Sequence, residues 1–329
     1  MKEKILVSLD GAEESLVTAW LLKKQGYSMR AVTFDITDVP EHKEALRKSV
    51  AEYERKLGIS IQVMECAHEA REIVESEVAQ GSERGFRYDI KTIFHQRFLF
   101  PKLLAMKDHF NFDKVATGHR VNVHFEPIEN RVSVVRYPTK EDDESHLLVG
   151  LTQKELRCLE FPLGTIPKSM IHKLADELSL GVEGASKLAK FELHHESRSE
   201  GARDNTPESE ALSLDSKFVE SVVFDILPGQ KRIDDVGQLE DRTIREIWFE
   251  NASWFSSEDL GFKIKHCMMS WKHEVQPVPV KIMQYEGSGL KVLCDQPLTG
   301  TSANIFSGDN VVWLEGETVL GGARVVQCL

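Results

Sequence analysis

The sequence predicts an α/β protein in which a parallel sheet covered by helices is followed by an all-β domain. Residues 4–119 alternate short β-rich runs with amphipathic helical segments, the order found in parallel sheets with crossover helices. After residue 260 the chain changes to short β-rich runs separated by turn residues, which favours a small barrel. Ligands of such a sheet bind in the crevice at the carboxyl ends of its strands.

The expected elements follow in a regular order. Apolar residues at helical spacing, with Gly26 and Gly58 as stop signals and Pro167 in a first turn, predict the helices. We expect strands at 4–9, 29–36, 59–66 and 112–119, helices at 13–25, 42–57, 90–107 and 167–180, and barrel strands at 263–271, 278–285, 289–295, 310–316 and 318–326. The polar stretch 192–216 is typical of a linker.

Composition narrows the functional classes. The 329 residues carry a formal net charge of −12, so any nucleic-acid partner needs a local basic face, and we expect no DNA partner. The sequence shows no signal peptide and no apolar run of membrane-spanning length, so we expect a cytoplasmic protein without a membrane partner. Five cysteines, an odd number without a CxxC pair, argue against a disulfide framework and a metal site.

The turn between the first strand and the first helix carries the most informative motif. It reads Asp10-Gly11-Ala12-Glu13-Glu14-Ser15 and precedes a helix whose amino terminus suits an anion. Further motifs are the ATGH stretch at 116–119, Asp-Glu-Ser at 143–145, FPLG at 161–164 before Lys168, and LGG at 320–322. In this order, the motifs resemble those of the tRNA-specific 2-thiouridylases, the MnmA or TrmU family.

The resemblance implies a PP-loop fold of the adenine nucleotide alpha hydrolase type, a central domain and a carboxy-terminal barrel. It also implies ATP with Mg²⁺ as cofactor and tRNA, or a sulfur-relay protein, as partner. Members of the family adenylate the wobble uridine of certain tRNAs and replace its 2-oxygen with sulfur carried by two cysteines. Carried onto this sequence, the nucleotide-binding positions are Asp10, Gly11, Ala12, Glu13, Glu14, Ser15, Phe34, Gly118 and His119.

The two cysteine positions of the family hold other residues here. Asp89 matches the family's acidic position, Thr92 replaces the first cysteine and Glu192 replaces the second. A hydroxyl is a poor substitute for a thiolate nucleophile. No cysteine occurs between Cys158 and Cys267. Direct persulfide transfer by this chain is therefore not expected.

The loop is also more acidic than that of the family, with Asp10 and Glu13 added to the usual acid. At an effective dielectric of 20, a unit charge about 5 Å from a phosphate costs about 3 kcal/mol. One interpretation is a capping box, in which Asp10 accepts the Glu13 amide and Glu13 reaches back to the Asp10 amide. The other is a retained nucleotide site, with a metal ion between Asp10, Glu14 and the phosphates.

We expect three regions: the PP-loop domain at 1–195, a linker and reduced central domain at 196–259, and the barrel at 260–329. The main hypothesis is a degenerate 2-thiouridylase-like protein that keeps the tRNA-modification scaffold without thiol-based sulfur transfer. The alternative is an active enzyme that thiolates the wobble uridine of tRNA, or adenylates a related substrate, with ATP and externally supplied sulfur. Whether the chain is an enzyme is left open by the sequence.

Overall fold

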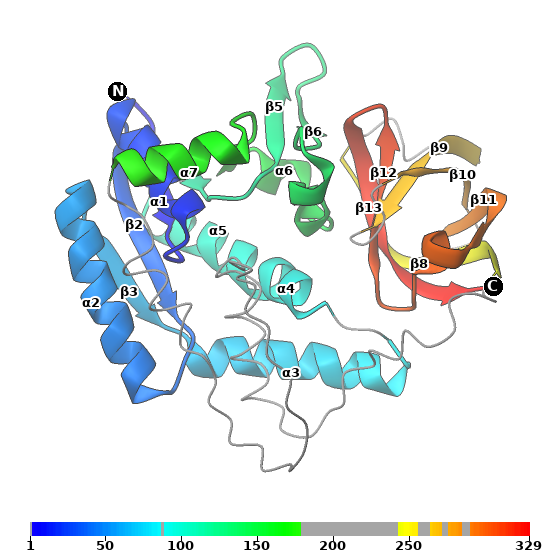
Figure 1. Cartoon of the computed structure of the whole chain (residues 1–329), viewed down its shortest axis with the longest axis horizontal. Helices are drawn as coiled ribbons and strands as arrows, with labels where there is room; N and C mark the ends of the chain where they lie inside the picture. The colour runs from blue at the N-terminus through cyan, green and yellow to red at the C-terminus, as the bar shows by residue number, and fades with distance from the viewer. Residues whose placement is uncertain (1, 87–88, 179–242, 256–263, 272–275, 285–289) are drawn as a thin grey trace, which may run out of the picture.

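The structure, a computed structural model, describes residues 2–86, 89–178, 243–255, 264–271, 276–284 and 290–329. An α/β domain and a β-barrel pack against each other in this part of the chain (Figure 1). The expected linker at 192–216 lies outside the described residues, as does most of the expected central domain.

The centre of the amino-terminal domain is a parallel sheet with the strand order β3-β2-β1-β4-β7 among the described residues. Its strands are β1 (Lys4–Ser8), β2 (Ser28–Asp35), β3 (Ile61–Glu65), β4 (Lys114–Ala116) and β7 (Leu159–Glu160). The four strands expected from the sequence are confirmed, whereas the two-residue β7 was not predicted. β1 pairs with both β2 and β4, so the turns that follow β1 and β4 lie side by side.

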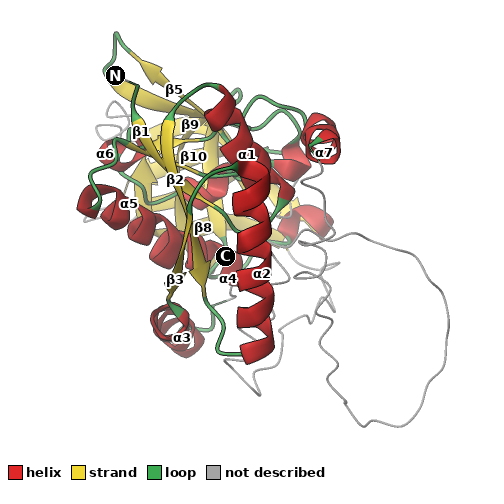
Figure 2. Ribbon diagram, turned by 90° about the vertical axis from the view of Figure 1, so that its left-hand side faces the viewer, coloured by secondary structure: helices red, strands yellow, loops and turns green. Residues whose placement is uncertain are grey.

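Helices cover both faces of this sheet (Figure 2). They are α1 (Glu13–Lys24), α2 (Pro40–Leu57), α3 (Ala67–Glu83), α4 (Ile90–Ile93), α5 (Phe100–His109), α6 (Gln153–Leu156) and α7 (Lys168–Glu177). Ile5 and Val7 of β1 pack with α1 and α2, and Leu6 packs with α3 and α5, because successive side chains of a strand point to opposite faces. α2 ends at Gly58, which adopts φ 58°.

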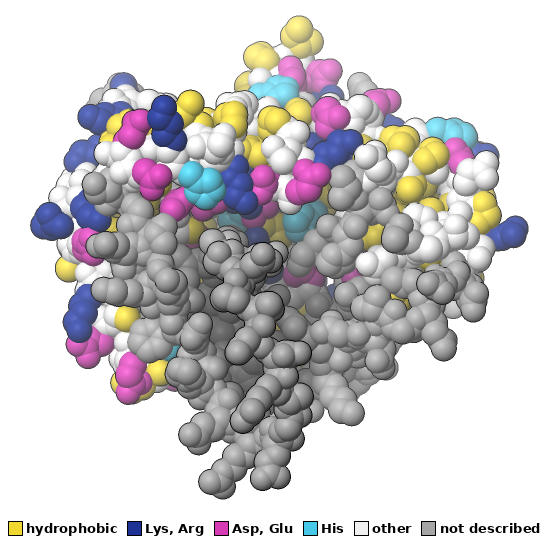
Figure 3. Space-filling model, viewed as in Figure 1, with side chains coloured by type: hydrophobic (Ala, Val, Ile, Leu, Met, Phe, Trp, Pro, Cys, Tyr) yellow, Lys and Arg dark blue, Asp and Glu magenta, His cyan; other side chains and the backbone are white. Residues whose placement is uncertain are grey.

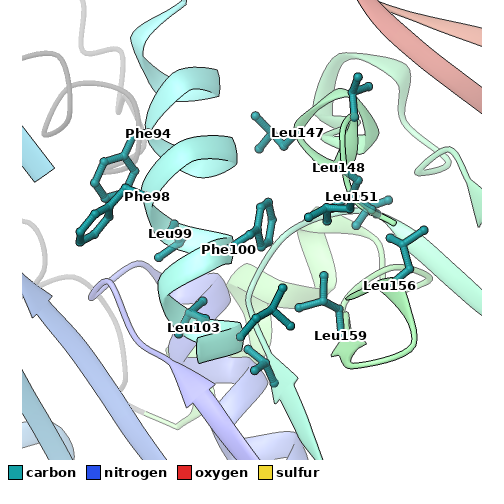
Figure 4. Close-up of a cluster of buried hydrophobic side chains, with 14 of the residues drawn as sticks. Phe94, Phe98, Leu99, Phe100, Leu103, Leu147, Leu148, Leu151, Leu156 and Leu159 are labelled. Atoms are coloured by element: carbon teal, nitrogen blue, oxygen red, sulfur yellow. The ribbon is translucent and has the colours of Figure 1, made fainter. Parts of the chain in front are cut away.

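A π-helical stretch, η1 (Phe94–Leu99), joins α4 to α5. The Phe100 amide donates to the His95 carbonyl five residues back, and Pro101, which has no amide proton, follows. Figure 4 shows Phe100 pointing from this helix toward Leu151, while Phe94 and Phe98 point to the opposite side. Phe94 and Phe98 of the π-helix and Phe100 of α5 thus enter one buried cluster from different sides of the helix, and Phe98 packs edge to face with Phe34 of β2 at 5.5 Å.

The barrel is antiparallel and closes on itself in the strand order β12-β9-β10-β11-β8-β13 among the described residues, because β12 also pairs with β13. Its strands are β8 (Thr243–Trp254), β9 (Ile264–Trp271), β10 (Val278–Gln284), β11 (Leu290–Thr299), β12 (Asn310–Glu315) and β13 (Thr318–Cys328). The five expected strands are confirmed. The expected boundary at 260 needs a correction, since β8 pairs with both β11 and β13 and belongs to the barrel.

The barrel is joined to the amino-terminal domain by a hairpin of β5 (Asn122–Glu126) and β6 (Arg131–Val135). β6 pairs with the start of β13, so a strand pair of the first domain extends the barrel sheet. Phe255, directly after β8, is 2% exposed and belongs to a buried cluster that holds mainly residues of the amino-terminal domain and also Val312, Leu314 and Val319 of the barrel. Arg84 forms two hydrogen bonds to Glu250 of β8, at 3.0 and 2.7 Å.

Candidate functional site

A pocket opens where β1, β2 and β4 end, the position expected for a ligand of a parallel sheet. The site residues expected from the sequence that line it are Asp10, Ala12, Glu14, Phe34, Gly118 and His119. Apolar walls come from Leu9, Phe34, Ile36, Leu46, Phe94 and Leu99, and polar groups include Thr33, Asp35, Thr37 and His42. The pocket therefore combines a large apolar wall with hydrogen-bonding groups, as small-molecule sites do.

The loop after β1 turns at Gly11, which adopts φ 88°. Asp10 Oδ1 accepts hydrogen bonds from the Ala12 amide at 2.9 Å and the Ser15 hydroxyl at 2.5 Å. Helix α1 begins at Glu13 with Ala12 as its N-cap, which makes no side-chain capping bond. The predicted capping box is therefore wrong: Asp10 closes a turn to Ala12 instead, and the Glu13 carboxylate contacts the His172 imidazole of α7.

The turn after β4 presses against this loop. A Cβ atom at Gly118 would lie 2.7 Å from the Ser15 amide nitrogen, closer than side chains can approach, so only glycine fits. Thr117 and His119 flank it and are 2% and 8% exposed. The Thr117 hydroxyl and His119 Nδ1 are 2.8 Å apart, and the His119 ring packs edge-on against His95 of η1.

Arg120, next in the chain, reaches the start of α1. One guanidinium nitrogen lies 2.7 Å from the Glu14 carboxylate and another lies 3.4 Å from Glu144. The Arg120 amide also donates to Glu144 at 2.9 Å. Asp142 joins the group at 3.9 Å from Arg120 and forms a 2.9 Å ion pair with Lys168. These contacts connect the loop after β1 with Glu144 of the motif at 143–145 and with Asp142, which directly precedes that motif.

Glu144 is the most buried carboxylate of the group, at 5% exposure. Burial by itself would raise its pKa, but Lys91 at 2.8 Å and the nearby Arg120 outweigh burial and hold the pKa well below its ordinary value. Asp143, its neighbour, behaves in the opposite way, because burial raises its pKa despite hydrogen bonds from Ser145 and Tyr137. Glu144 is thus an ionised part of the pocket wall.

Asp89 and Thr92, two of the positions expected to carry sulfur chemistry, are not among the described residues that line the pocket. Asp89 caps α4: its carboxylate accepts the Thr92 amide at 3.3 Å and the Thr92 hydroxyl at 2.9 Å. Thr92 is 1% exposed, so its hydroxyl is buried, and it is hydrogen-bonded to Asp89. Glu192 lies outside the described residues.

None of the described pocket-lining residues is a cysteine. Burial raises the pKa of the Cys66 thiol, and it raises that of Cys294 in the barrel to about 11. Within the described ranges no group of three or more His, Cys, Asp or Glu side chains is arranged to hold a metal ion. The metal ion expected between Asp10, Glu14 and the phosphates stays a prediction; in the described loop the Asp10 carboxylate accepts the Ala12 amide, and the Glu14 carboxylate pairs with Arg120.

Several lining residues were missed by sequence reasoning, notably Asp35, His42 and His95. Asp35 carried a usable signal, since it ends a predicted strand at the edge where ligands bind. His95 gave no signal in the sequence, because the π-helical turn directs its side chain to the pocket. In the part of the chain that the structure describes, no helix is long and apolar enough to cross a membrane.

A parallel sheet with its pocket beyond β1, β2 and β4, followed by a closed barrel, defines a PP-loop protein of the α/β class. The family described as "tRNA methyl transferase HUP domain" matches residues 3–187, more than half of the chain, and the chain belongs to that family.

Similar proteins with curated names carry the name of the family that the sequence motifs resemble. The "tRNA-specific 2-thiouridylase MnmA" of Endomicrobium trichonymphae is 24% identical, over 98% of this chain and 99% of the relative. The protein of the same name from Synechocystis is 23% identical, over 99% and 97%. A solved 4-thiouridine synthetase in complex with RNA and ATP is 17% identical over 56% of this chain and 42% of that chain, at a TM-score of 0.37.

Proposed function

We propose that this chain is a degenerate 2-thiouridylase-like protein that keeps the tRNA-modification scaffold and does not transfer sulfur through its own thiols. The observation that carries the proposal is the buried Thr92 at the first cysteine position, hydrogen-bonded to Asp89. A thiol at this place would have to be accessible to a sulfur donor and to the activated base. The second position, Glu192, offers no thiol either.

The role that remains for such a scaffold is binding of tRNA or of a sulfur-relay protein, and the charges of the described residues bear on tRNA. On the barrel, Lys291 pairs with Glu246 at 3.2 Å and lies over the Trp248 ring, so its charge already has a partner within the barrel. On the face in Figure 3, basic and acidic side chains of the described residues are interspersed. RNA binding by this chain is therefore expected to be weak, because few phosphates are neutralised on a surface of mixed charge.

Thiolation is tested with the purified chain, a persulfide donor, ATP, Mg²⁺ and unmodified tRNA, with nucleoside mass spectrometry as readout. The 2-thiouridylase of Endomicrobium trichonymphae, assayed in parallel, is the positive control. We expect 2-thiouridine from the control and none from this chain. Binding of labelled tRNA at low salt is measured in the same preparation, and its absence would contradict the scaffold role.

The second candidate is an ATP-dependent enzyme that uses externally supplied sulfur. The close approach of Gly118 to the Ser15 backbone favours it, because this packing joins two turns that line the pocket at the strand ends. Replacing the persulfide donor with inorganic sulfide separates the two candidates. Sulfide-dependent 2-thiouridine with release of AMP would establish the enzyme and overturn the degenerate reading.

A further inference from the structure

The charges around the pocket point to the kind of ligand it accepts. The described lining residues include four carboxylates, Asp10, Glu14, Asp35 and Glu144, and one guanidinium, Arg120. With histidines counted as neutral, these lining groups sum to 1 − 4 = −3, and Lys91, which pairs with Glu144 from outside the lining, brings the sum to −3 + 1 = −2. Carboxylates only accept hydrogen bonds, so the lining suits a ligand rich in donors, such as ribose hydroxyls and the amino groups of a base. A polyphosphate offers only acceptors and negative charge, so this lining does not suit it.

The cations near the start of α1 already have partners. Arg120 lies within 4 Å of three carboxylates, those of Glu14, Asp142 and Glu144. Lys91 pairs with Glu144, and Lys168 pairs with Asp142. Three cations and three carboxylates therefore neutralise one another within the described site. A polyphosphate that recruited Arg120 would leave the buried Glu144 with one cation fewer, which is costly in a low-dielectric site.

Arg120 also lies where the phosphates would otherwise sit. Glu14 is the second residue of α1, and the amino terminus of the first helix is the anion position in this type of fold. The Glu14 and Arg120 side chains are 13% and 14% exposed, so their ion pair is largely enclosed. Gly118 holds the Arg120 segment against the helix, because its backbone touches that of Ser15.

We propose that the Arg120–Glu14 pair fills the polyphosphate position and that the pocket selects a nucleoside without a polyphosphate chain. Arg120 is then a specificity-determining residue: Glu14 takes the place of a bound phosphate, and Arg120 is its internal counter-ion in place of a divalent cation. The apolar wall with Phe34 and Leu46 takes the base, and Asp10, Asp35 and Thr37 face the sugar hydroxyls. This inference deepens the proposed function. It rests on that function in one respect, namely that the pocket of the scaffold still accepts a nucleoside.

The primary test is calorimetric titration of the full chain with adenosine and with ATP, each with and without Mg²⁺. We expect adenosine to bind at least tenfold more tightly than ATP in both conditions. ATP with Mg²⁺ binding as tightly as adenosine, or more tightly, would overturn the inference. Absence of binding by either compound would also overturn it, whereas the tRNA-binding and thiolation assays would still judge the proposed function separately.

Two isosteric variants test the role of Arg120. Glu14→Gln removes its carboxylate partner, so ATP affinity should rise about tenfold while adenosine affinity changes less than twofold. Glu13→Gln makes the same charge change one residue earlier, at a carboxylate that contacts His172 and not Arg120. ATP affinity of Glu13→Gln should change less than threefold. Equal gains in the two variants would mean that general repulsion sets the selectivity, and the assigned role of Arg120 would be wrong.

Discussion

The backbone of Gly118 lies directly against that of Ser15, and this contact joins the turn after β4 to the start of α1. It holds the two walls of the pocket together, since both turns contribute lining residues. The contact leaves no room for even one carbon atom on residue 118.

Gly118→Ala should therefore destabilise the fold by about 3 kcal/mol or more, because the added methyl group meets backbone atoms, which cannot move aside as a flexible side chain can. Gly150→Ala is the matched control: Gly150 has φ 97° but nothing within 4 Å of an added Cβ. That variant should cost about 1 kcal/mol, the strain of the dihedral angle alone. Urea unfolding measures both free energies, and equal costs would contradict the close-contact explanation.

The Thr92 hydroxyl supports a second prediction. Thr92→Val keeps the shape but removes the donor to Asp89, so the free energy of unfolding should fall by about 1–2 kcal/mol. Thr92→Ser keeps the hydroxyl and should lose less than half as much. A valine variant as stable as the wild type would show that this hydrogen bond contributes nothing to the fold.

Local signals in the sequence were sufficient for the alternating strands and helices of the first domain. Gly58, for example, stops α2 through its left-handed conformation. Helix α3 was missed although Ala70, Val74 and Val78 are buried at a spacing of four residues. Strand β8 was assigned to the wrong region because its partners are distant: Ile247 pairs with Val292 and Cys328.

In the candidate site, too, contacts between residues that are distant in the sequence could not be predicted. The motif positions 10–15 and 118–119 were located from the sequence, but the partners of the added acids were not. Glu13 and Glu14 are neighbours, yet Glu13 contacts His172, 159 residues away, and Glu14 contacts Arg120, 106 residues away. Repulsion estimated from the loop alone therefore ignored the cations that the fold brings to it.

Glu144 supports a pH prediction. Its pKa is held well below the ordinary value in the folded chain, so its contribution to stability is present above the unfolded pKa of about 4.3 and is lost as the pH falls through the folded value. Glu144→Gln leaves Lys91 and Arg120 with one carboxylate fewer and should cost about 3–5 kcal/mol at pH 7.

The difference in stability between the wild type and Glu144→Gln should shrink below about pH 4.3, where the wild-type carboxylate begins to lose its advantage over the amide. Glu141→Gln is the control, since Glu141 is exposed on the same segment. Chemical unfolding from pH 3 to 8 provides the curves. A constant difference across that range would show that the ionised form of Glu144 is not what stabilises the fold.

Phe255 links the two domains energetically. It follows a barrel strand, its amide donates to the Leu320 carbonyl of β13 at 2.9 Å, and its ring lies in a buried cluster formed by residues of both domains. Phe255→Ala should cost about 3–5 kcal/mol and loosen the barrel from the α/β domain, so that tryptophan fluorescence, which reports mainly on the barrel, and far-ultraviolet circular dichroism give separate unfolding transitions. Ile128→Ala, at a side chain that is 99% exposed, should cost less than about 0.5 kcal/mol and keep the transitions coincident. If the Phe255 variant still unfolds in one transition at wild-type stability, the domain contact does not depend on this ring.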